Sequence, residues 1–241
     1  MTNPTAAILI IGDEILSGRT REGNAYWLAG ELLAAGITLA EIRVIPDDHA
    51  TIKAAVVELS GRNDTLFTSG GIGPTHDDIT ADAVADAFGR SIDVRDDARA
   101  LLAAHYKSRD LEFTAARMRM ARIPEGALLI ENPVSVAPGF SIGNTYVMAG
   151  VPSVFQAMVA TVLPTLTGGA PLLSESWRVQ RPESDVADQL RALADAYPAL
   201  SFGSYPFTIK GEYGTNLVVR GTDAALLAAA YDDLKSSFPV A

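Results

Sequence analysis

Two loops, each rich in glycine and acidic residues, carry the side chains best suited to chemistry. The first, Gly12 to Gly18, contains the adjacent carboxylates Asp13 and Glu14. The second runs from Ser69 to Thr80. Each loop follows a short apolar run, which predicts a buried strand ahead of it. The positions that we single out in the second loop are Gly70, Gly71, Gly73, Pro74, Thr75, His76, Asp77 and Asp78.

The second loop has the composition of a phosphate-binding loop. Its glycines allow positive φ angles and a close approach of the backbone to a ligand. Successive N–H groups can then form an anion-binding concavity, and a helix starting near Thr80 adds the partial positive charge of its N-terminus. The loop lacks Gly-Lys-Ser/Thr, so it is not a nucleoside-triphosphate loop of the usual kind. We therefore predict that the residues from Gly70 to His76 contact phosphate.

The acids of both loops need a cation if the ligand is a phosphate. Carboxylates repel phosphate unless a divalent ion lies between them, and neither loop contains a lysine. We therefore expect Mg²⁺, Mn²⁺ or Co²⁺ to be held by Asp13, Glu14, Asp77 and Asp78.

The residues alone also permit a simpler interpretation. Gly-Gly loops with acids are common turns, and aspartate near a helix start is an ordinary cap. A single loop histidine such as His76 is more often solvated than catalytic. Asp47, which follows a predicted strand and Pro46, either reaches the same crevice as the loops or belongs to the turn before the next helix.

Composition limits the choice of partners and compartment. The chain of 241 residues is 48% hydrophobic, has a net charge of −10 and contains no cysteine. Such a charge argues against a nucleic-acid partner, and thiolate metal sites and disulfides are excluded. No apolar run is long enough to span a membrane, and the N-terminus lacks the basic start of a signal peptide. We expect a cytoplasmic protein that binds a small phosphate-bearing ligand.

Alternating strands and helices must position these loops. The pattern predicts a three-layer αβα sandwich with a largely parallel sheet, in which ligands bind beyond the carboxyl ends of the strands. Asn24 is predicted to cap a helix that ends before Gly36. A Gly-rich and Pro-containing stretch, 167–171, separates a first domain, 1–168, from a small α+β subdomain, 172–241.

Several motifs together resemble the molybdopterin-binding domain family (MoaB/Mog-like). The resemblance is greatest to the N-terminal domain of competence/damage-inducible protein A (CinA), and it covers nearly the whole chain. The small subdomain contributes Gly203 to Pro206. The other matching stretches are Ile11 to Thr20, Asn24, Gly70 to Thr80, Pro124 to Ala127, Asn132 to Val134, Ala137 to Phe140 and Gly150 to Ser153.

The resemblance implies a three-layer fold, a dimer or trimer, and more than one activity. Family members bind molybdopterin, some adenylylate it with Mg-ATP, and CinA-like domains are linked to a metal-dependent ADP-ribose pyrophosphatase activity. A related domain accompanies FAD synthase. By matching positions, Asp47 and Asp78 are the catalytic acids, Asp13, Glu14 and Asn24 belong to the first motif, and Asn132 contacts a ligand.

The chain also departs from the family pattern. Glu22 stands where many members have aspartate, and Ser135 stands where many have glycine, so both could reshape the pocket. Many CinA proteins continue into a nicotinamide-nucleotide amidohydrolase domain, an activity that we do not expect of this chain.

Three hypotheses remain open at this point. The first is a metal-dependent hydrolase of a dinucleotide pyrophosphate such as ADP-ribose. The second is a molybdopterin-binding or molybdopterin-adenylylating protein, and the third is a structural oligomer with a vestigial site.

Overall fold

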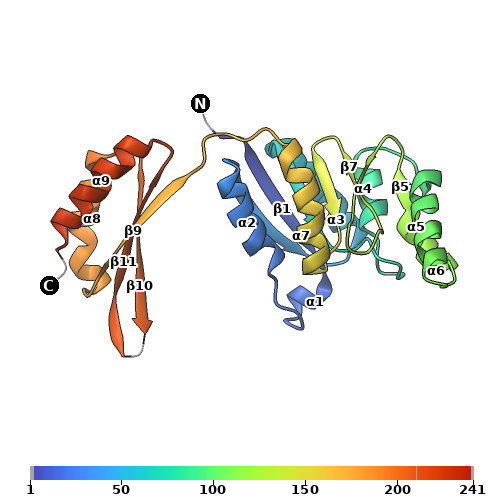
Figure 1. Cartoon of the computed structure of the whole chain (residues 1–241), viewed down its shortest axis with the longest axis horizontal. Coiled ribbons are helices and arrows are strands. Elements are labelled where there is room, and N and C mark those ends of the chain that lie inside the picture. Colours follow the sequence, from blue (N-terminus) through green and yellow to red (C-terminus); the bar gives the residue numbers. More distant parts are fainter. Residues whose placement is uncertain (1–2, 210, 240–241) are drawn as a thin grey trace. The chain divides into compact units, whose positions relative to one another are not determined.

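The computed structural model describes residues 3–209 and 211–239. The chain divides into two compact units, Met1–Gly169 and Ala170–Ala241 (Figure 1). Each unit has its own sheet and its own hydrophobic core. We describe them separately as unit 1 and unit 2.

Unit 1 is built on a six-stranded mixed sheet. The first four strands in spatial order are parallel to one another, whereas β7 runs antiparallel to β8 and β6 antiparallel to β7. In spatial order the strands are β2 (Thr38–Ile45), β1 (Thr5–Ile11), β3 (Thr65–Ser69), β8 (Thr145–Met148), β7 (Gly139–Ile142) and β6 (Leu128–Ile130).

Helices cover both faces of this sheet. Alternate residues of β1 join two separate cores, because successive side chains of a strand point to opposite faces. Ala7, Leu9 and Ile11 pack with the helices of one face: α3 (His49–Arg62), α4 (Thr80–Ala87) and α5 (Asp96–Ser108). Ala6, Ile8 and Ile10 pack with α2 (Asn24–Ala34) and α7 (Pro152–Val162), which lie together in Figure 1.

Short elements complete unit 1. They include a two-stranded antiparallel ribbon, which the sequence did not predict. The ribbon and the remaining short elements are β4 (Ile92–Val94), β5 (Arg122–Pro124), α1 (Asp13–Leu16), α6 (Ala115–Met118), and the 3₁₀ turns η1 (Arg119–Ala121) and η2 (Leu163–Thr165).

The predicted capping role of Asn24 is wrong. Asn24 is the first residue of α2 and Gly23 precedes it as the cap, without a side-chain hydrogen bond. Glu22 instead accepts a hydrogen bond from the N–H of Ala25 at 2.9 Å. The Asn24 amide is free to turn inward because Glu22 takes over the contact with the helix start. The helix end is as predicted, since Gly36 has a φ of 70°.

Unit 2 is a three-stranded antiparallel sheet in the order β10-β11-β9 with two helices. Leu217 and Val219, on one face of β11, are fully buried with the helices. The elements are β9 (Leu173–Val179), α8 (Glu183–Ala196), β10 (Ser201–Ile209), β11 (Glu212–Gly221) and α9 (Ala224–Ser237).

The fold class is thus the predicted one, a largely parallel α/β sandwich followed by a small α+β unit. Within the described part of the chain, no helix has the length and apolar character that a membrane crossing requires.

Candidate functional site

The carboxyl ends of four parallel strands meet at one edge of the sheet in unit 1. Ile11 at the end of β1 lies opposite Ile45 of β2, and Ile10 lies opposite Ser69 of β3. Ser69 in turn lies opposite Met148 of β8. The loops that follow these strands are therefore neighbours, as the sequence predicted for the two loops rich in glycine and acids.

The start of the second loop requires glycine. Gly70 has a φ of 113°, and a Cβ there would lie 2.1 Å from the carbonyl oxygen of Ile11. Gly71 has a φ of 69°, and a Cβ there would lie 2.1 Å from the hydroxyl oxygen of Thr80. Both the backbone angle and the lack of space exclude larger residues. The loop thus packs directly on the end of β1 and on the start of α4.

Asp78 holds the second half of this loop together through hydrogen bonds to Thr75. Its Oδ2 accepts hydrogen bonds from the backbone N–H of Thr75 at 2.8 Å and from the Thr75 hydroxyl at 2.6 Å. The same oxygen lies 2.6 Å from the position of a Cβ on Gly73. The carboxylate therefore sits against the loop backbone, with Gly73 making room for it.

Asp47 joins the site from the turn that follows β2. Its Oδ2 accepts a hydrogen bond from the backbone N–H of Asp13 at 2.9 Å. Burial raises the pKa of Asp47, and the negative charges of Asp13, Glu14 and Asp77 raise it further, while the hydrogen bond from Asp13 opposes them. The neighbouring Asp48 caps α3 by accepting from Thr51 N–H at 2.8 Å. Asp47 therefore reaches the crevice beside the two loops, and its neighbour Asp48 caps the helix.

A cavity of about 490 Å³ lies where these loops meet. Its volume is in the range of small-molecule sites. It is lined by eight of the residues predicted from the sequence: Glu14, Asp47, Gly70, Gly71, Gly73, Asp77, Asp78 and Asn132.

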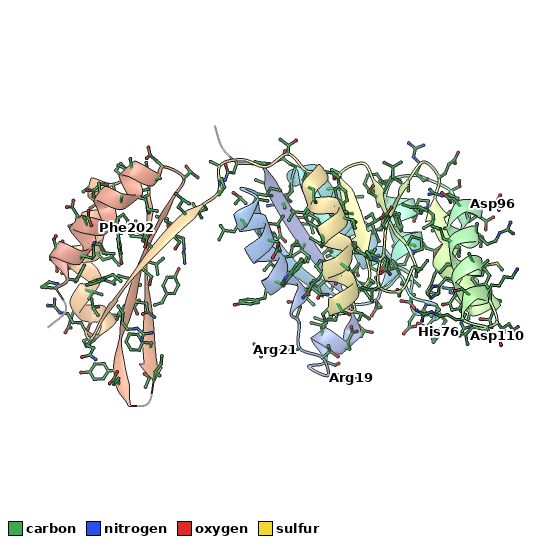
Figure 2. All side chains as sticks on the ribbon, in the orientation of Figure 1. Arg19, Arg21, His76, Asp96, Asp110 and Phe202 are labelled. Atoms are coloured by element: carbon green, nitrogen blue, oxygen red, sulfur yellow. The ribbon has the colours of Figure 1, made fainter. Side chains whose placement is uncertain are left out.

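The other predicted site residues lie outside the cavity wall. Asp13 contributes its backbone N–H to Asp47, and Thr75 is engaged with Asp78. His76 is exposed, and Figure 2 shows it at the periphery of unit 1. Pro74 is also exposed. Direct ligand contact by these residues stays a prediction.

Asn24 connects three elements around the site. It is 5% exposed, and its amide N–H groups donate to the Ser69 hydroxyl and to the Gly150 carbonyl, both at 2.8 Å. These bonds tie the start of α2 to the ends of β3 and β8. Asn24 thereby holds the cavity wall in position, and it lines a smaller pocket of about 60 Å³ beside the main cavity.

Asn132 organises a turn that forms another part of the cavity wall. Its amide donates to the Ser135 hydroxyl at 2.6 Å and to the Ala137 carbonyl at 2.8 Å. Its carbonyl accepts from the N–H groups of Val134 and Ser135, both at 3.1 Å. The residue stabilises the turn with its whole side-chain amide, so the predicted ligand contact of Asn132 competes with these bonds.

Sequence reasoning missed several residues of the wall. Gly150 to Pro152 follow β8, and the rule that ligands bind at strand carboxyl ends could have identified them. Met120 comes from η1 and had no comparable signal. Ser135, one of the departures from the family pattern, also lines the cavity, where it replaces a glycine with a hydroxyl group.

The arrangement of the acids bears on which kind of metal site the cavity could form. Among residues 3–209 and 211–239, no group of three or more His, Asp or Glu side chains is arranged to hold a metal ion. Yet four carboxylates line one cavity, and burial, together with repulsion from the nearby acids, raises the pKa of Asp47. Mg²⁺ commonly uses one or two carboxylates, waters and substrate phosphates. The residues fit that mode rather than a closed protein cage.

The fold and the cavity define an open α/β domain with its cleft at the strand carboxyl ends, where such sheets bind ligands. The chain belongs to the molybdopterin-binding domain family. Residues 7–168 match the family described as a probable molybdopterin binding domain. Residues 171–241 match the middle domain of FAD synthase.

Similar proteins include CinA-like proteins, as the sequence motifs indicated. A CinA-like protein of Desulfosudis oleivorans is 35% identical over 209 residues, covering 82% of this chain and 51% of that protein. A protein of Pyrobaculum calidifontis is 36% identical over 212 residues, covering 84% of this chain and 81% of that protein. The chain thus spans about half of the length of the CinA-like relative.

A solved structure shares the fold of unit 1. It is the CinA protein of Thermoplasma acidophilum, whose function is described as unknown. It is 32% identical, with a TM-score of 0.62, and the match covers 67% of this chain and 98% of that one.

Proposed function

We propose that unit 1 is a divalent-metal-dependent hydrolase of a dinucleotide pyrophosphate of the ADP-ribose type. One observation carries the proposal: a single cavity of about 490 Å³ is lined both by a glycine loop and by four carboxylates. The first suits phosphate and the second suits a metal ion. CinA-like relatives support the choice of substrate class only through the resemblance stated above.

The cavity wall suits both halves of such a substrate. The backbone N–H groups of Gly71 and Gly73 would bind the phosphates, whereas the N–H of Gly70 already donates to the Met148 carbonyl at 3.1 Å. Apolar side chains of Ile72 and Met120, with Val151 and Val154, would contact the adenine ring. The site would therefore bind a ligand with an anionic centre and a flat apolar end.

Glu14, Asp77 and Asp78 would hold the ion together with phosphate oxygens, and Asp47 would act on water. A bound divalent ion would neutralise charge on the phosphates and lower the pKa of bound water. Burial and three nearby acids raise the pKa of Asp47, which makes this carboxylate a stronger base. Its Oδ2 is oriented by the N–H of Asp13.

The reaction would be a hydrolytic displacement at phosphorus. Asp47 accepts a proton from the attacking water, whose oxygen forms a bond to one phosphorus atom. The bond from that phosphorus to the bridging oxygen breaks, and the bridging oxygen leaves with the second phosphate. The products of ADP-ribose are AMP and ribose 5-phosphate.

The second candidate is a binding module for a molybdopterin-type ligand, with or without adenylylation. The family match over residues 7–168 favours it. Both candidates use the same cavity and differ in turnover, so one set of variants can test both.

The test is incubation of the full chain with ADP-ribose and Mg²⁺, Mn²⁺ or Co²⁺, with AMP measured by chromatography. Asp47→Asn and Asp78→Asn keep the shape of each side chain, and each should lower the rate by about 100-fold or more. Asp96→Asn is the matched control, because Asp96 is exposed at the start of α5 (Figure 2). Its rate should stay within about twofold of the wild type.

Two results would count against the proposal. Absence of AMP from the wild-type protein, with tight binding of a molybdopterin-type ligand, would favour the binding module. Full activity in both site variants would show that the two acids are assigned wrongly.

A further inference from the structure

Arg119 lies beside the site with most of its hydrogen-bonding capacity unused. Its Nη2 donates to the backbone carbonyl of Asp78 over a long distance of 3.4 Å. Its Nε is buried and has no hydrogen-bond partner among the described residues. Buried N–H groups of this kind are rare and call for a partner.

The neighbouring arginines are occupied. Arg122 makes a bidentate ion pair with Asp82, at 2.7 and 2.5 Å. Arg117 lies over the ring of Tyr106, 4.3 Å from its centre, and also donates to a backbone carbonyl. Arg119 has no acidic side chain within 4.0 Å in residues 3–209 and 211–239. In a chain of net charge −10, it is an arginine without an ion pair among the described residues.

A second, small cavity of about 20 Å³ lies at Arg119. It shares Ile72, Gly73, Asp78 and Met120 with the large cavity. A volume of this size accommodates about one water-sized group. The Arg122–Asp82 ion pair also lines it, so the small cavity has room for a single oxygen atom beside two guanidinium groups and the carboxylates of Asp78 and Asp82. The four shared residues place it next to the main cavity.

We propose that Arg119 and this cavity form an oxyanion subsite that takes one phosphate oxygen of the ligand. The inference deepens the proposed function and depends on it for the ligand class, a pyrophosphate. The carboxylates would bind the metal ion. Arg119 would bind a phosphate oxygen that the metal ion does not contact. An arginine suits this position, because its planar group stays charged when it is buried and donates in a fixed geometry.

The test is binding of inorganic pyrophosphate, with Mg²⁺ at a fixed concentration, to the full chain by calorimetry. Arg119→Gln should raise the dissociation constant about 10-fold or more, as expected for loss of a charge-assisted hydrogen bond. Arg119→Lys should recover part of the affinity. Arg117→Gln is the matched control and should change the dissociation constant by less than about twofold.

The salt dependence of binding separates charge recognition from support of the loop. Loss of a cation that contacts phosphate should make the affinity of Arg119→Gln fall less steeply with KCl than that of the wild type. A merely structural role through the Asp78 carbonyl would leave this slope unchanged. If Arg119→Gln fails to fold, Arg119→Lys retains the charge and decides the question by its affinity and its slope.

The inference is overturned if wild type and Arg119→Gln bind pyrophosphate alike, or if the wild type does not bind it. Its failure can be told from failure of the hydrolase proposal. Arg119-dependent binding without AMP formation refutes hydrolysis alone. AMP formation with Arg119-independent pyrophosphate binding refutes the subsite alone.

Discussion

The sheets of unit 1 and unit 2 differ in strand direction, and this difference explains where the candidate site lies. In unit 1, four neighbouring strands are parallel, so their carboxyl ends and the loops that follow share one edge. In unit 2, both strand pairs are antiparallel, so neighbouring strands of the sheet end at opposite edges. Parallel order concentrates loop chemistry, whereas antiparallel order disperses it.

The two sheets also differ in how they are covered. Helices cover both faces of the unit 1 sheet, which leaves its strand ends as the place for polar groups. One face of the unit 2 sheet carries its own paired side chains: Arg178 lies over Phe207, and Arg220 over Tyr205. The paired arginines of unit 2 contrast with Arg119 of unit 1, whose Nε lacks a partner among the described residues.

The largest expected losses of stability come from removing one buried aromatic ring from the core of each unit. Phe67→Ala in β3 and Phe238→Ala after α9 both remove fully buried rings, and each should cost about 3–5 kcal/mol in its own unit. The chain has two tryptophans, one per unit, which provide separate probes. Trp27 contacts Phe155 in unit 1, and Trp177 donates to the Phe238 carbonyl in unit 2.

Urea unfolding would be followed by fluorescence in Trp27→Phe and Trp177→Phe backgrounds. Phe67→Ala should shift the Trp27 transition, and Phe238→Ala the Trp177 transition. Equal shifts of both transitions by either variant would mean that the units unfold as one.

An intermediate effect is expected from alanine at two glycines with positive φ. Gly71→Ala should cost more than about 2 kcal/mol, because strain adds to a clash with Thr80. Gly211→Ala, ahead of β11, has a φ of +87° but open space for a Cβ, and it should cost about 1 kcal/mol. Urea midpoints measure both costs, and equal costs would show that the crowding at Gly71 relaxes without penalty.

The smallest effect concerns Asp47. Because its pKa is raised in the folded protein, the folded state holds more protons than the unfolded state between the two pKa values. Stability should therefore fall as pH rises through that window. Asp47→Asn should remove this loss and stabilise unit 1 at pH 7 by less than about 1 kcal/mol, since the side chain is partly solvated.

Thermal melts at pH 4 and pH 7 would measure the stability of Asp47→Asn relative to the wild type, with Asp96→Asn as the unaffected reference. A lower stability of Asp47→Asn at pH 7 would mean that the hydrogen bond from Asp13 outweighs burial and repulsion. Activity should fall in the same variant that gains stability.

Many residues of the site could be predicted from the sequence, because local patterns and the parallel order of the strands were sufficient to place the two loops together. Glycines before a helix and acids after apolar runs identified the loops, and parallel neighbours brought them together. Asn24 was misread as a cap because its inward contacts with Ser69 and Gly150 depend on residues far away in the chain. Those contacts satisfy the side-chain N–H groups of Asn24, while its Oδ1 is buried without a hydrogen-bond partner among the described residues.

The sequence by itself determined the fold class and most of its strands and helices, the two loops rich in glycine and acids, and the family. The tertiary structure alone decided which side chains face the cavity. It directed Asp47 into the cavity and left Asp48 as a helix cap, although the two residues are adjacent. It also placed Arg119 at the backbone carbonyl of Asp78, without an ion pair among the described residues. Local patterns record which backbone a residue favours, whereas burial and charge pairing depend on partners that only folding brings near.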